Sequence, residues 1–286
     1  MVAVLLTGAG GQLGTDIVKL AATRADVDLA AFTRTDLDVT NPESVAAAFE
    51  ATKPDVVIHA AAYTAVDDCE SNQEQAYAVN GAGTGNIVSA ASEHGARVIY
   101  VSTDYVFDGS KSDPYVETDT PNPSSVYGAS KLEGEQHVAR LGEDGLIVRT
   151  SWVCGANGAN MVKTILNAAE KHPMLTFVDD QIGKPTFTTD LADTLLTLAT
   201  RTDSGVMHVT NEGVVSWYEF CQDVLDAAGI GRDRVQPCAT SDLQPPRAAP
   251  RPANSVLANT RFDELGLGHL RHFGGPLKET IRNLTK

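Results

Sequence analysis

The sequence predicts an α/β fold built on a doubly wound parallel sheet, followed by a smaller C-terminal lobe. Short apolar runs alternate with helical patterns over the first 150 residues, as they do where a crossover helix joins each parallel strand to the next. A glycine-rich turn, Gly8–Gly14, follows the first apolar run directly, and the alternation weakens after residue 150. The sheet is therefore expected mainly within residues 1–150.

Composition indicates an ordinary globular protein and excludes several classes of partner. The chain has 286 residues, 42% of them hydrophobic and 21% charged, and no apolar run approaches the roughly 18 residues of a membrane span. A formal net charge of −15 argues against nucleic acid and anionic membranes as partners, because both repel an acidic surface. The cysteines lack the spacing of a metal site or a disulfide framework, which predicts a reducing cytoplasmic location. They are Cys69, Cys154, Cys221 and Cys238.

The glycine turn predicts a phosphate-binding loop of the Rossmann type. Val2–Thr7 supplies the strand, Gly8-x-x-Gly11-x-x-Gly14 supplies the turn, and apolar spacing from Ile17 onwards supplies the helix. In this order, the glycines let a pyrophosphate approach the backbone while its charge faces the helix N-terminus. The alternative is a glycine turn that binds nothing. We expect a dinucleotide cofactor here.

The end of the second strand predicts which cofactor is preferred. That strand covers Val27–Thr33, and Arg34 follows it, where NAD-binding folds usually carry an acidic residue for the ribose 2′-hydroxyl. An arginine can pair instead with a 2′-phosphate, which favours NADPH over NADH. The alternative is that Arg34 only faces solvent.

Further along, Asn41 and Pro42 predict the start of a helix. Asn41 can cap the helix, and proline is favoured in the first helical turn.

Two further strands bring polar residues to the carboxyl edge of the sheet. The third strand ends at His59, a helix is expected over Ala76–His94, and Arg97–Ser102 is the fourth strand. Ligands of doubly wound sheets bind outside the carboxyl ends of the strands, which is where Thr103 and Asp104 fall. A histidine within a strand, such as His59, is more often a structural residue than a catalyst.

A proton donor beside a cation is predicted on the next helix. The run Asn122-Pro123-Ser124-Ser125 supplies a helix start, and Tyr127 and Lys131 are four residues apart, so both side chains project from one face. A phenol has an unperturbed pKa of about 10, and a neighbouring ammonium favours the phenolate. The pair suits delivery of a proton to a carbonyl oxygen while a cofactor delivers hydride to the carbon. On its own, Tyr-x-x-x-Lys is usually an ordinary surface pair.

The second half of the chain predicts a lobe whose segments interleave with the sheet. We expect a dinucleotide-binding domain over residues 1–150, with segments near 180–210 returning to it. Residues 151–286 are expected to form mainly a substrate-binding lobe. Strands are expected over Leu146–Arg149 and Val206–Val209, a loop over residues 179–186, and helices over Thr189–Ala199, Ser216–Ala228 and Pro276–Leu284.

With the glycine loop, Thr103 and the Tyr127/Lys131 pair in place, the chain resembles the extended short-chain dehydrogenase/reductase superfamily. Within it, motifs along nearly the whole chain resemble the dTDP-4-dehydrorhamnose reductase family. They are Thr64-Ala65-Val66-Asp67, Ser102-Thr103-Asp104-Tyr105-Val106-Phe107-Asp108-Gly109, Val126-Tyr127-Gly128, Arg149-Thr150-Ser151-Trp152-Val153, the run from Asp180 to Thr186, and Arg251-Pro252-x-Asn254-Ser255.

The resemblance implies reduction of the C4 ketone of dTDP-4-dehydro-β-L-rhamnose by NAD(P)H, the last step in forming dTDP-L-rhamnose. It implies Tyr127 as proton donor and Thr103 as the group that polarises the ketone. It implies that Lys131 holds the nicotinamide ribose and favours ionisation of Tyr127, and that Asp104 and Trp152 contact the sugar. Further cofactor contacts are implied at Gly8, Gly11, Gln12, Leu13, Gly14, Asp38, Val39, Ala62, Tyr63 and Thr64.

Arg251 is the predicted cation for the substrate diphosphate. A strongly acidic protein repels a nucleotide diphosphate unless a local cation offsets that repulsion, and arginine can give two parallel hydrogen bonds to phosphate. The alternative is a solvated arginine in the proline-rich segment 244–254.

Two features depart from the family pattern or extend it. Cys154 stands where family members often have an aromatic residue, and we expect it to alter the sugar pocket. Some members dimerise through metal-bridged carboxylates, for which Asp16 and Asp190 are the candidates here. A homodimer is compatible with this resemblance, and Mg²⁺ is compatible with it but not predicted.

Other functions remain open. Nucleotide-sugar 4,6-dehydratases share the sheet and the Tyr/Lys pair, but they follow Thr-Asp with Glu, whereas Tyr105 stands here. A non-catalytic regulatory subunit, like that of methionine adenosyltransferase, shares the fold as well. The retained Tyr127 and Lys131 argue against it without excluding it. Other nucleotide-sugar reductases or epimerases form the remaining alternative.

Overall fold

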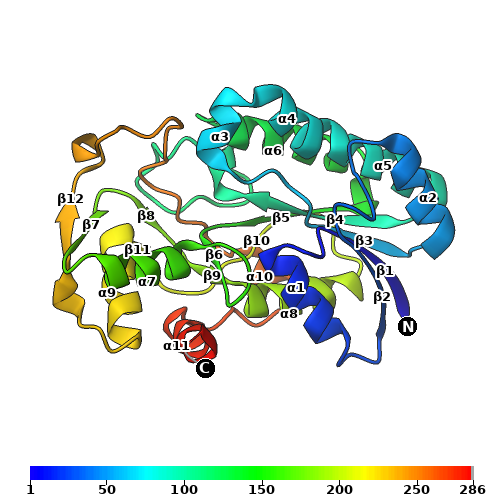
Figure 1. The fold of residues 1–286 in the computed structure, drawn as a ribbon. Coiled ribbons are helices and arrows are strands. Elements are labelled where there is room, and N and C mark those ends of the chain that lie inside the picture. The colour runs from blue at the N-terminus through cyan, green and yellow to red at the C-terminus, as the bar shows by residue number, and fades with distance from the viewer. Residues whose placement is uncertain (285–286) are drawn as a thin grey trace.

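A six-stranded parallel sheet forms the centre of the computed structural model, which describes residues 1–284 (Figure 1). The strand order is β10-β5-β4-β3-β1-β2, and every neighbouring pair is parallel. The connection order reverses between β1 and β3, which is where doubly wound folds bind ligands. The prediction of a doubly wound parallel sheet is confirmed. The strands are β1 (Val2–Thr7), β2 (Val27–Phe32), β3 (Val56–His59), β4 (Arg97–Thr103), β5 (Gly145–Thr150) and β10 (Gly205–His208).

Helices cover both faces of the sheet, because successive side chains of a strand point to opposite faces. In β1, Val4 and Leu6 pack in one apolar cluster and Leu5 packs in another. Helices α1 and α8 complete the first cluster, below the sheet in Figure 1, and α2, α5 and α6 complete the second, above it. These helices are α1 (Gln12–Ala21), α2 (Pro42–Thr52), α5 (Gly83–His94), α6 (Val126–Ala139) and α8 (Thr188–Ala199).

The segment Ala76–His94 is helical throughout, as predicted, but the helix starts earlier, at Gln73, and contains a π-helical turn. A short helix, α4 (Gln73–Tyr77), passes through a π-helical turn over residues 78–82 before α5 begins. Within that turn, the Asn80 amide accepts a hydrogen bond from the Tyr63 backbone N–H (2.8 Å) and donates one to the Tyr63 carbonyl (3.1 Å). It also donates to Ser130 Oγ on α6 (3.0 Å). The turn thus fixes the segment after β3, which begins with Ala60 and leads into α3 (Val66–Ser71).

A third apolar cluster forms the core of the lobe at the left of Figure 1. Its main helices are α7 (Met161–Lys171), α9 (Trp217–Ala227) and α11 (Gly274–Leu284), with a short α10 (Arg261–Glu264) near the sheet. Its paired strands are β7 (Leu175–Val178) with β12 (Val235–Cys238), β6 (Val153–Cys154) with β9 (Thr186–Phe187), and β8 (Ile182–Gly183) with β11 (Val215–Ser216). Residues 179–186, expected as a loop, therefore contain β8 and the start of β9. Among the described residues, no helix combines the length and apolar character needed to cross a membrane.

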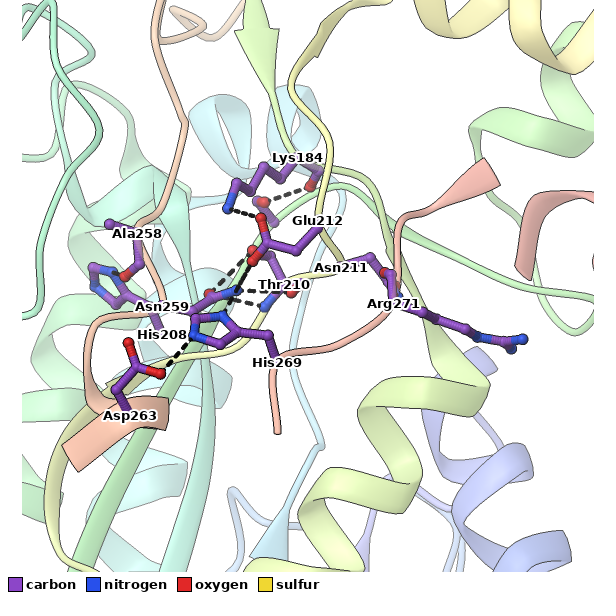
Figure 2. Close-up of polar contacts among 11 residues, drawn as sticks. Lys184, His208, Thr210, Asn211, Glu212, Ala258, Asn259, Asp263, His269 and Arg271 are labelled. Atoms are coloured by element: carbon purple, nitrogen blue, oxygen red, sulfur yellow. Dashed lines mark hydrogen bonds and ion pairs between the residues drawn. The ribbon is translucent and has the colours of Figure 1, made fainter. Parts of the chain in front are cut away.

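A polar network fastens the C-terminal segment to the loop after β10 (Figure 2). The Glu212 carboxylate accepts from Lys184 Nζ (2.9 Å) and from Asn259 Nδ2 (3.2 Å). On its other side, His269 Nδ1 lies 3.4 Å from Glu212 Oε1, and His269 Nε2 lies 3.1 Å from Asp263 Oδ1. The network joins segments that are far apart in sequence, so it fixes the lobe against the edge of the sheet.

Candidate functional site

A cavity of about 400 Å³ opens at the carboxyl ends of β1, β4 and β5. Its wall combines the glycine loop, the end of β4, the first turns of α6 and the segment after β5. Most of the residues predicted from sequence to act on a substrate or cofactor lie here. They are Gly8, Gly11, Gln12, Leu13, Gly14, Ala62, Thr64, Thr103, Asp104, Tyr127, Lys131 and Trp152.

A second cavity of about 630 Å³ shares Gly8, Gly11 and Ala62 with the first, so the two form one continuous groove across the switch point. Its outer part contains the remaining residues predicted for the cofactor, which are Arg34, Asp38, Val39 and Tyr63. Arg34 is exposed at this end, and hydrogen bonds from Thr40, with a contribution from the Arg34 charge, lower the pKa of the nearby Asp38 carboxyl. The groove has the extent and the two-part form that a dinucleotide needs.

The glycine loop is shaped for close backbone approach. Gly8 has φ +75°, and a Cβ there would lie 2.8 Å from the backbone nitrogen of Ala61. A Cβ on Gly14 would collide with the Gly8 carbonyl oxygen. Gly11 caps α1 without any side-chain hydrogen bond, and the start of α1 lines the cavity. Helix N-termini of this kind bind pyrophosphate through their first backbone N–H groups.

Helix α6 begins as predicted and carries the phenol and the ammonium into the cavity. Ser125 Oγ accepts the Gly128 N–H (3.2 Å) and caps the helix. Tyr127 is 8% exposed and Lys131 2% exposed. Lys131 Nζ donates to the carbonyl of Val101 (2.7 Å) and lies 4.0 Å from the ring centroid of Tyr100.

Burial dominates the protonation of this pair. Burial lowers the pKa of Lys131 to about 7, opposed by the Glu135 carboxylate. Burial raises the pKa of Tyr127, opposed by hydrogen bonding with Thr103. The Lys131 ammonium is directed at Val101 and Tyr100, so burial and not its charge dominates the pKa of Tyr127 here, and an effect of Lys131 on the ionisation of Tyr127 stays a prediction.

Three buried polar atoms on the wall of the cavity have no hydrogen-bond partner within the described part of the chain. They are Gln12 Oε1, Asp104 Oδ2 and Thr150 Oγ1. Buried polar groups are rarely left unpaired, so these atoms are available to a ligand. Thr150 was not singled out from the sequence. Its position as the last residue of β5, paired with Thr103 across the sheet, was the available signal.

Arg251 does not line either cavity. Its guanidinium donates to Asp67 Oδ2 (2.7 Å) and to the Ala249 carbonyl (2.9 Å). It also lies 5.9 Å from the ring centroid of Tyr105, which does line the catalytic cavity. The cation therefore sits beside the cavity, held by the first turn of α3.

The structure corrects the expectation for Cys154. The thiol is 1% exposed and packs in the apolar core of the lobe with Val162, Ile165 and Phe187. It is absent from the described lining of both cavities. An effect of Cys154 on a sugar pocket is therefore indirect.

Asp16 and Asp190, the candidate metal carboxylates, are engaged within the chain. Asp16 is buried and accepts hydrogen bonds from Asn157 (2.9 Å) and Thr188. Asp190 accepts from Asn211 (2.7 Å) and pairs with Arg271 (3.0 Å). Residues 1–284 contain no group of three or more His, Cys, Asp or Glu side chains placed to hold a metal ion.

His59 is structural, as the sequence favoured. It is fully buried, with ring nitrogens 2.7 Å from Thr7 Oγ1 and 3.1 Å from Thr84 Oγ1. Burial lowers its pKa to about 3, with a smaller effect from Lys131. The neutral ring links β1, β3 and α5.

Comparison with known proteins agrees with this geometry. The model of the RmlD substrate binding domain family matches residues 2–286. A dTDP-4-dehydrorhamnose reductase of Mycobacterium tuberculosis is 42% identical over an alignment 287 residues long, which covers 97% of this chain and 92% of the relative. The crystal structure of a dTDP-4-dehydrorhamnose reductase from Clostridium acetobutylicum superposes with a TM-score of 0.94 at 41% identity, covering 99% of each chain.

A structure of the Bacillus anthracis dTDP-4-dehydrorhamnose reductase in complex with NADP is 35% identical and superposes with a TM-score of 0.92, covering 98% of each chain. The family match spans nearly the whole chain, and the relatives are covered over almost their full length. The chain therefore belongs to the RmlD family, the family of the dTDP-4-dehydrorhamnose reductases.

Proposed function

We propose that this protein reduces the C4 ketone of dTDP-4-dehydro-β-L-rhamnose to the hydroxyl of dTDP-L-rhamnose, with NADPH as the preferred cofactor. The single observation that carries the proposal is the meeting of Tyr127, Thr103 and Lys131 in a cavity that continues into a dinucleotide-sized groove. A proton donor, a second hydroxyl and a cation, all buried in one site, are groups suited to carbonyl reduction.

NADPH supplies the hydride that adds to C4. Tyr127 gives its proton to the ketone oxygen as that oxygen gains negative charge, which converts the carbonyl to a hydroxyl. Thr103 hydrogen-bonds the same oxygen. Lys131 binds the ribose hydroxyls beside the nicotinamide, and its positive charge stabilises the phenolate that Tyr127 leaves behind. The ketone thus gains one hydride at C4 and one proton at O4, which gives the hydroxyl.

The remaining cofactor contacts follow the groove. Gly8, Gly11 and Gly14 admit the pyrophosphate to the start of α1, with Gln12 and Leu13 beside it. Arg34 pairs with the 2′-phosphate, which is the reason for preferring NADPH to NADH. At the adenine end lie Asp38 and Val39, and along the inner wall Ala62, Tyr63 and Thr64.

The sugar nucleotide occupies the catalytic cavity and extends towards Arg251. Asp104 accepts from a sugar hydroxyl through the Oδ2 atom that has no partner in the described residues, and Trp152 offers an apolar face. Arg251 binds the diphosphate. In this proposal residues 1–150, with the returning segments near 180–210, bind the cofactor, and residues 151–286 mainly bind the sugar nucleotide.

Two expectations about the intact protein go beyond these contacts. A homodimer rests on the family resemblance, and a location in the cytoplasm rests on the cysteine pattern. Light scattering coupled to size-exclusion chromatography measures the molar mass in solution and tests the first, with and without Mg²⁺ in the buffer.

One experiment separates an enzyme from a regulatory subunit. Purified protein incubated with NADPH and dTDP-4-dehydro-L-rhamnose should oxidise one NADPH for each dTDP-L-rhamnose formed, without a partner protein. dTDP-glucose has no C4 ketone, so it should give no oxidation. Tight NADPH binding without turnover of any 4-keto sugar nucleotide would contradict the proposal and favour a binding role.

A further inference from the structure

The two tryptophans of the chain are stacked face to face. The ring centroids of Trp152 and Trp217 are 3.5 Å apart and their planes differ by 5°. Trp152 follows β5 and lines the catalytic cavity, whereas Trp217 opens α9 in the lobe and is absent from the described cavity lining. Trp217, which lies outside the cavity, therefore covers one face of Trp152, which forms part of the cavity wall.

This contact differs from the other aromatic contacts around it. Phe220 meets both indoles edge-on, at 66° to Trp152 and 71° to Trp217. Edge-on and offset arrangements are those that isolated aromatic pairs prefer, because the ring faces repel one another electrostatically. Nearly complete overlap of two indoles is therefore imposed by the surrounding structure.

The surroundings of Trp152 leave its ring little freedom. Its backbone has φ 49°, a conformation that bulky residues seldom adopt and that commonly occurs at functional sites. Its Nε1 donates to Ser255 Oγ (3.1 Å). A Cβ on Gly183 would lie 2.5 Å from Trp152 Cε2, so only a glycine lets β8 approach the indole this closely.

Trp217 is fixed just as firmly. It is the first residue of α9, and the preceding Ser216 forms a capping box with Glu219, with hydrogen bonds of 3.1 and 2.8 Å. Its backbone N–H donates to the Gln181 carbonyl (3.3 Å). The indole of Trp217 is thus a rigid backing for Trp152 that the lobe supplies.

We propose that Trp217 is a positioning residue for the sugar nucleotide, acting by holding the Trp152 ring in the orientation in which it lines the catalytic cavity. The inference rests on the proposed function, in which Trp152 contacts the sugar. With Trp217 removed, the Trp152 ring gains freedom that must be lost again on binding. The effect should therefore appear in KM for the sugar nucleotide and not in NADPH binding.

Three variants test this. Trp217→Leu should raise KM for the sugar nucleotide by about three- to tenfold, the range expected for loss of one aromatic pair, with kcat within twofold and NADPH affinity unchanged. Trp217→Phe should restore KM to within about twofold of wild type, since a ring again backs Trp152. Leu225→Ala is the control, because Leu225 is fully buried in the same helix and cluster; it should lower stability and leave KM unchanged. An unchanged KM in Trp217→Leu would overturn the inference.

The wild-type protein provides a test that needs no stable variant at position 217. Two closely stacked indoles contribute a coupled signal to the ultraviolet circular dichroism spectrum, and this signal should persist when dTDP-L-rhamnose binds. Its loss on binding would show that the stack opens and would refute a fixed backing. If the wild type does not turn over the ketone, the proposed function fails. The inference is then decided by calorimetric affinity for dTDP-L-rhamnose, which should fall in Trp217→Leu and recover in Trp217→Phe.

Discussion

Thr103 Oγ1 donates a hydrogen bond to Asp104 Oδ1, across 2.9 Å, at the carboxyl end of β4. Thr103 Oγ1 also accepts a hydrogen bond from the Tyr105 backbone N–H (3.2 Å). A hydroxyl has one proton, so this arrangement commits the Thr103 proton to the carboxylate. To donate to a ketone, Thr103 must exchange that bond for one to the substrate.

The buried Asp104 side chain lowers the stability of the fold when it is ionised. Burial raises the pKa of Asp104 from 3.8 to about 6, opposed by hydrogen bonds that include the one from Thr103. Because the folded state binds the proton more tightly than the unfolded state, stability falls as pH rises from about 4 to above 6. Asp104→Asn removes this dependence. The free energy of unfolding of the variant relative to wild type should increase by about 2–3 kcal/mol between pH 4 and pH 8. Urea unfolding at several pH values measures it, and a difference that does not change with pH would contradict a strained carboxylate.

Replacement of the phenol tests the proton donor. Tyr127→Phe should preserve the fold and NADPH affinity while kcat falls by roughly 10²–10⁴-fold, the usual contribution of a positioned acid. Thr103→Val should lower kcat less, because it removes one hydrogen bond between uncharged groups. Single-turnover measurements isolate the chemical step. Retention of more than half the wild-type rate in Tyr127→Phe, with chemistry limiting, would rule out its role.

Cofactor binding should take up protons through Lys131. With a pKa of about 7, Lys131 is only partly charged at neutral pH, and the negative charge of NADPH favours its ammonium form. The bound pKa then lies above the free one, so affinity falls as pH rises above about 7, and binding at pH 7 takes up to about half a proton. Calorimetry in buffers of different ionisation enthalpy measures this uptake. Lys131→Met should abolish it, and the same uptake in that variant would assign the proton to another group.

The sequence predicts the sheet well because the signals for it are local. Alternating strand and helix patterns specify the Rossmann half, and Asn41 and Ser125 begin α2 and α6 as predicted. The π-helical turn could not be foreseen, since it depends on contacts of Asn80 with Tyr63 and Ser130 on other elements. In the same way α7, β7 and β12 depend on a shared apolar core that no short pattern reveals.

In the site as well, the sequence identifies most of the residues but not their protonation or their long-range contacts. Strand ends and motifs were enough to choose the residues that gather in the groove. Protonation could not be predicted, because burial acts on Tyr127 and Lys131 more strongly than their spacing on α6 suggests. Trp217 was overlooked because its contact with Trp152 joins positions far apart in the chain.

Cofactor preference should depend on Arg34. This side chain is exposed at the outer end of the groove, where a 2′-phosphate is expected to lie. A charged hydrogen bond contributes roughly 1.5–3 kcal/mol, so Arg34→Ala should reduce the preference for NADPH over NADH by about tenfold or more. Fluorescence titration with each cofactor measures the ratio. Equal weakening of both cofactors would show that Arg34 only faces water.

Arg251 should bind the substrate diphosphate from its position beside the cavity. Asp67 holds one guanidinium nitrogen at 2.7 Å, and the ring centroid of Tyr105, which lines the catalytic cavity, lies 5.9 Å from the guanidinium. Arginine has five N–H donors, so donors remain for phosphate oxygens while the bond to Asp67 persists. Arg251→Ala should therefore raise KM for the sugar nucleotide by about tenfold or more, with NADPH affinity unchanged.

Two further variants show whether Arg251 acts on the substrate or only on its own loop. Arg251→Lys should give an intermediate KM, because an ammonium keeps the charge but loses the paired geometry that a guanidinium offers a phosphate. Arg247→Ala is the matched control, since Arg247 lies in the same segment, 3.8 Å from the same Asp67 oxygen, and is 47% exposed. It should leave KM within about twofold of wild type, as expected for an exposed ion pair. If Arg251→Ala lowers the melting temperature but leaves KM unchanged, the arginine serves only to hold residues 244–254 against α3, and the diphosphate must be bound elsewhere.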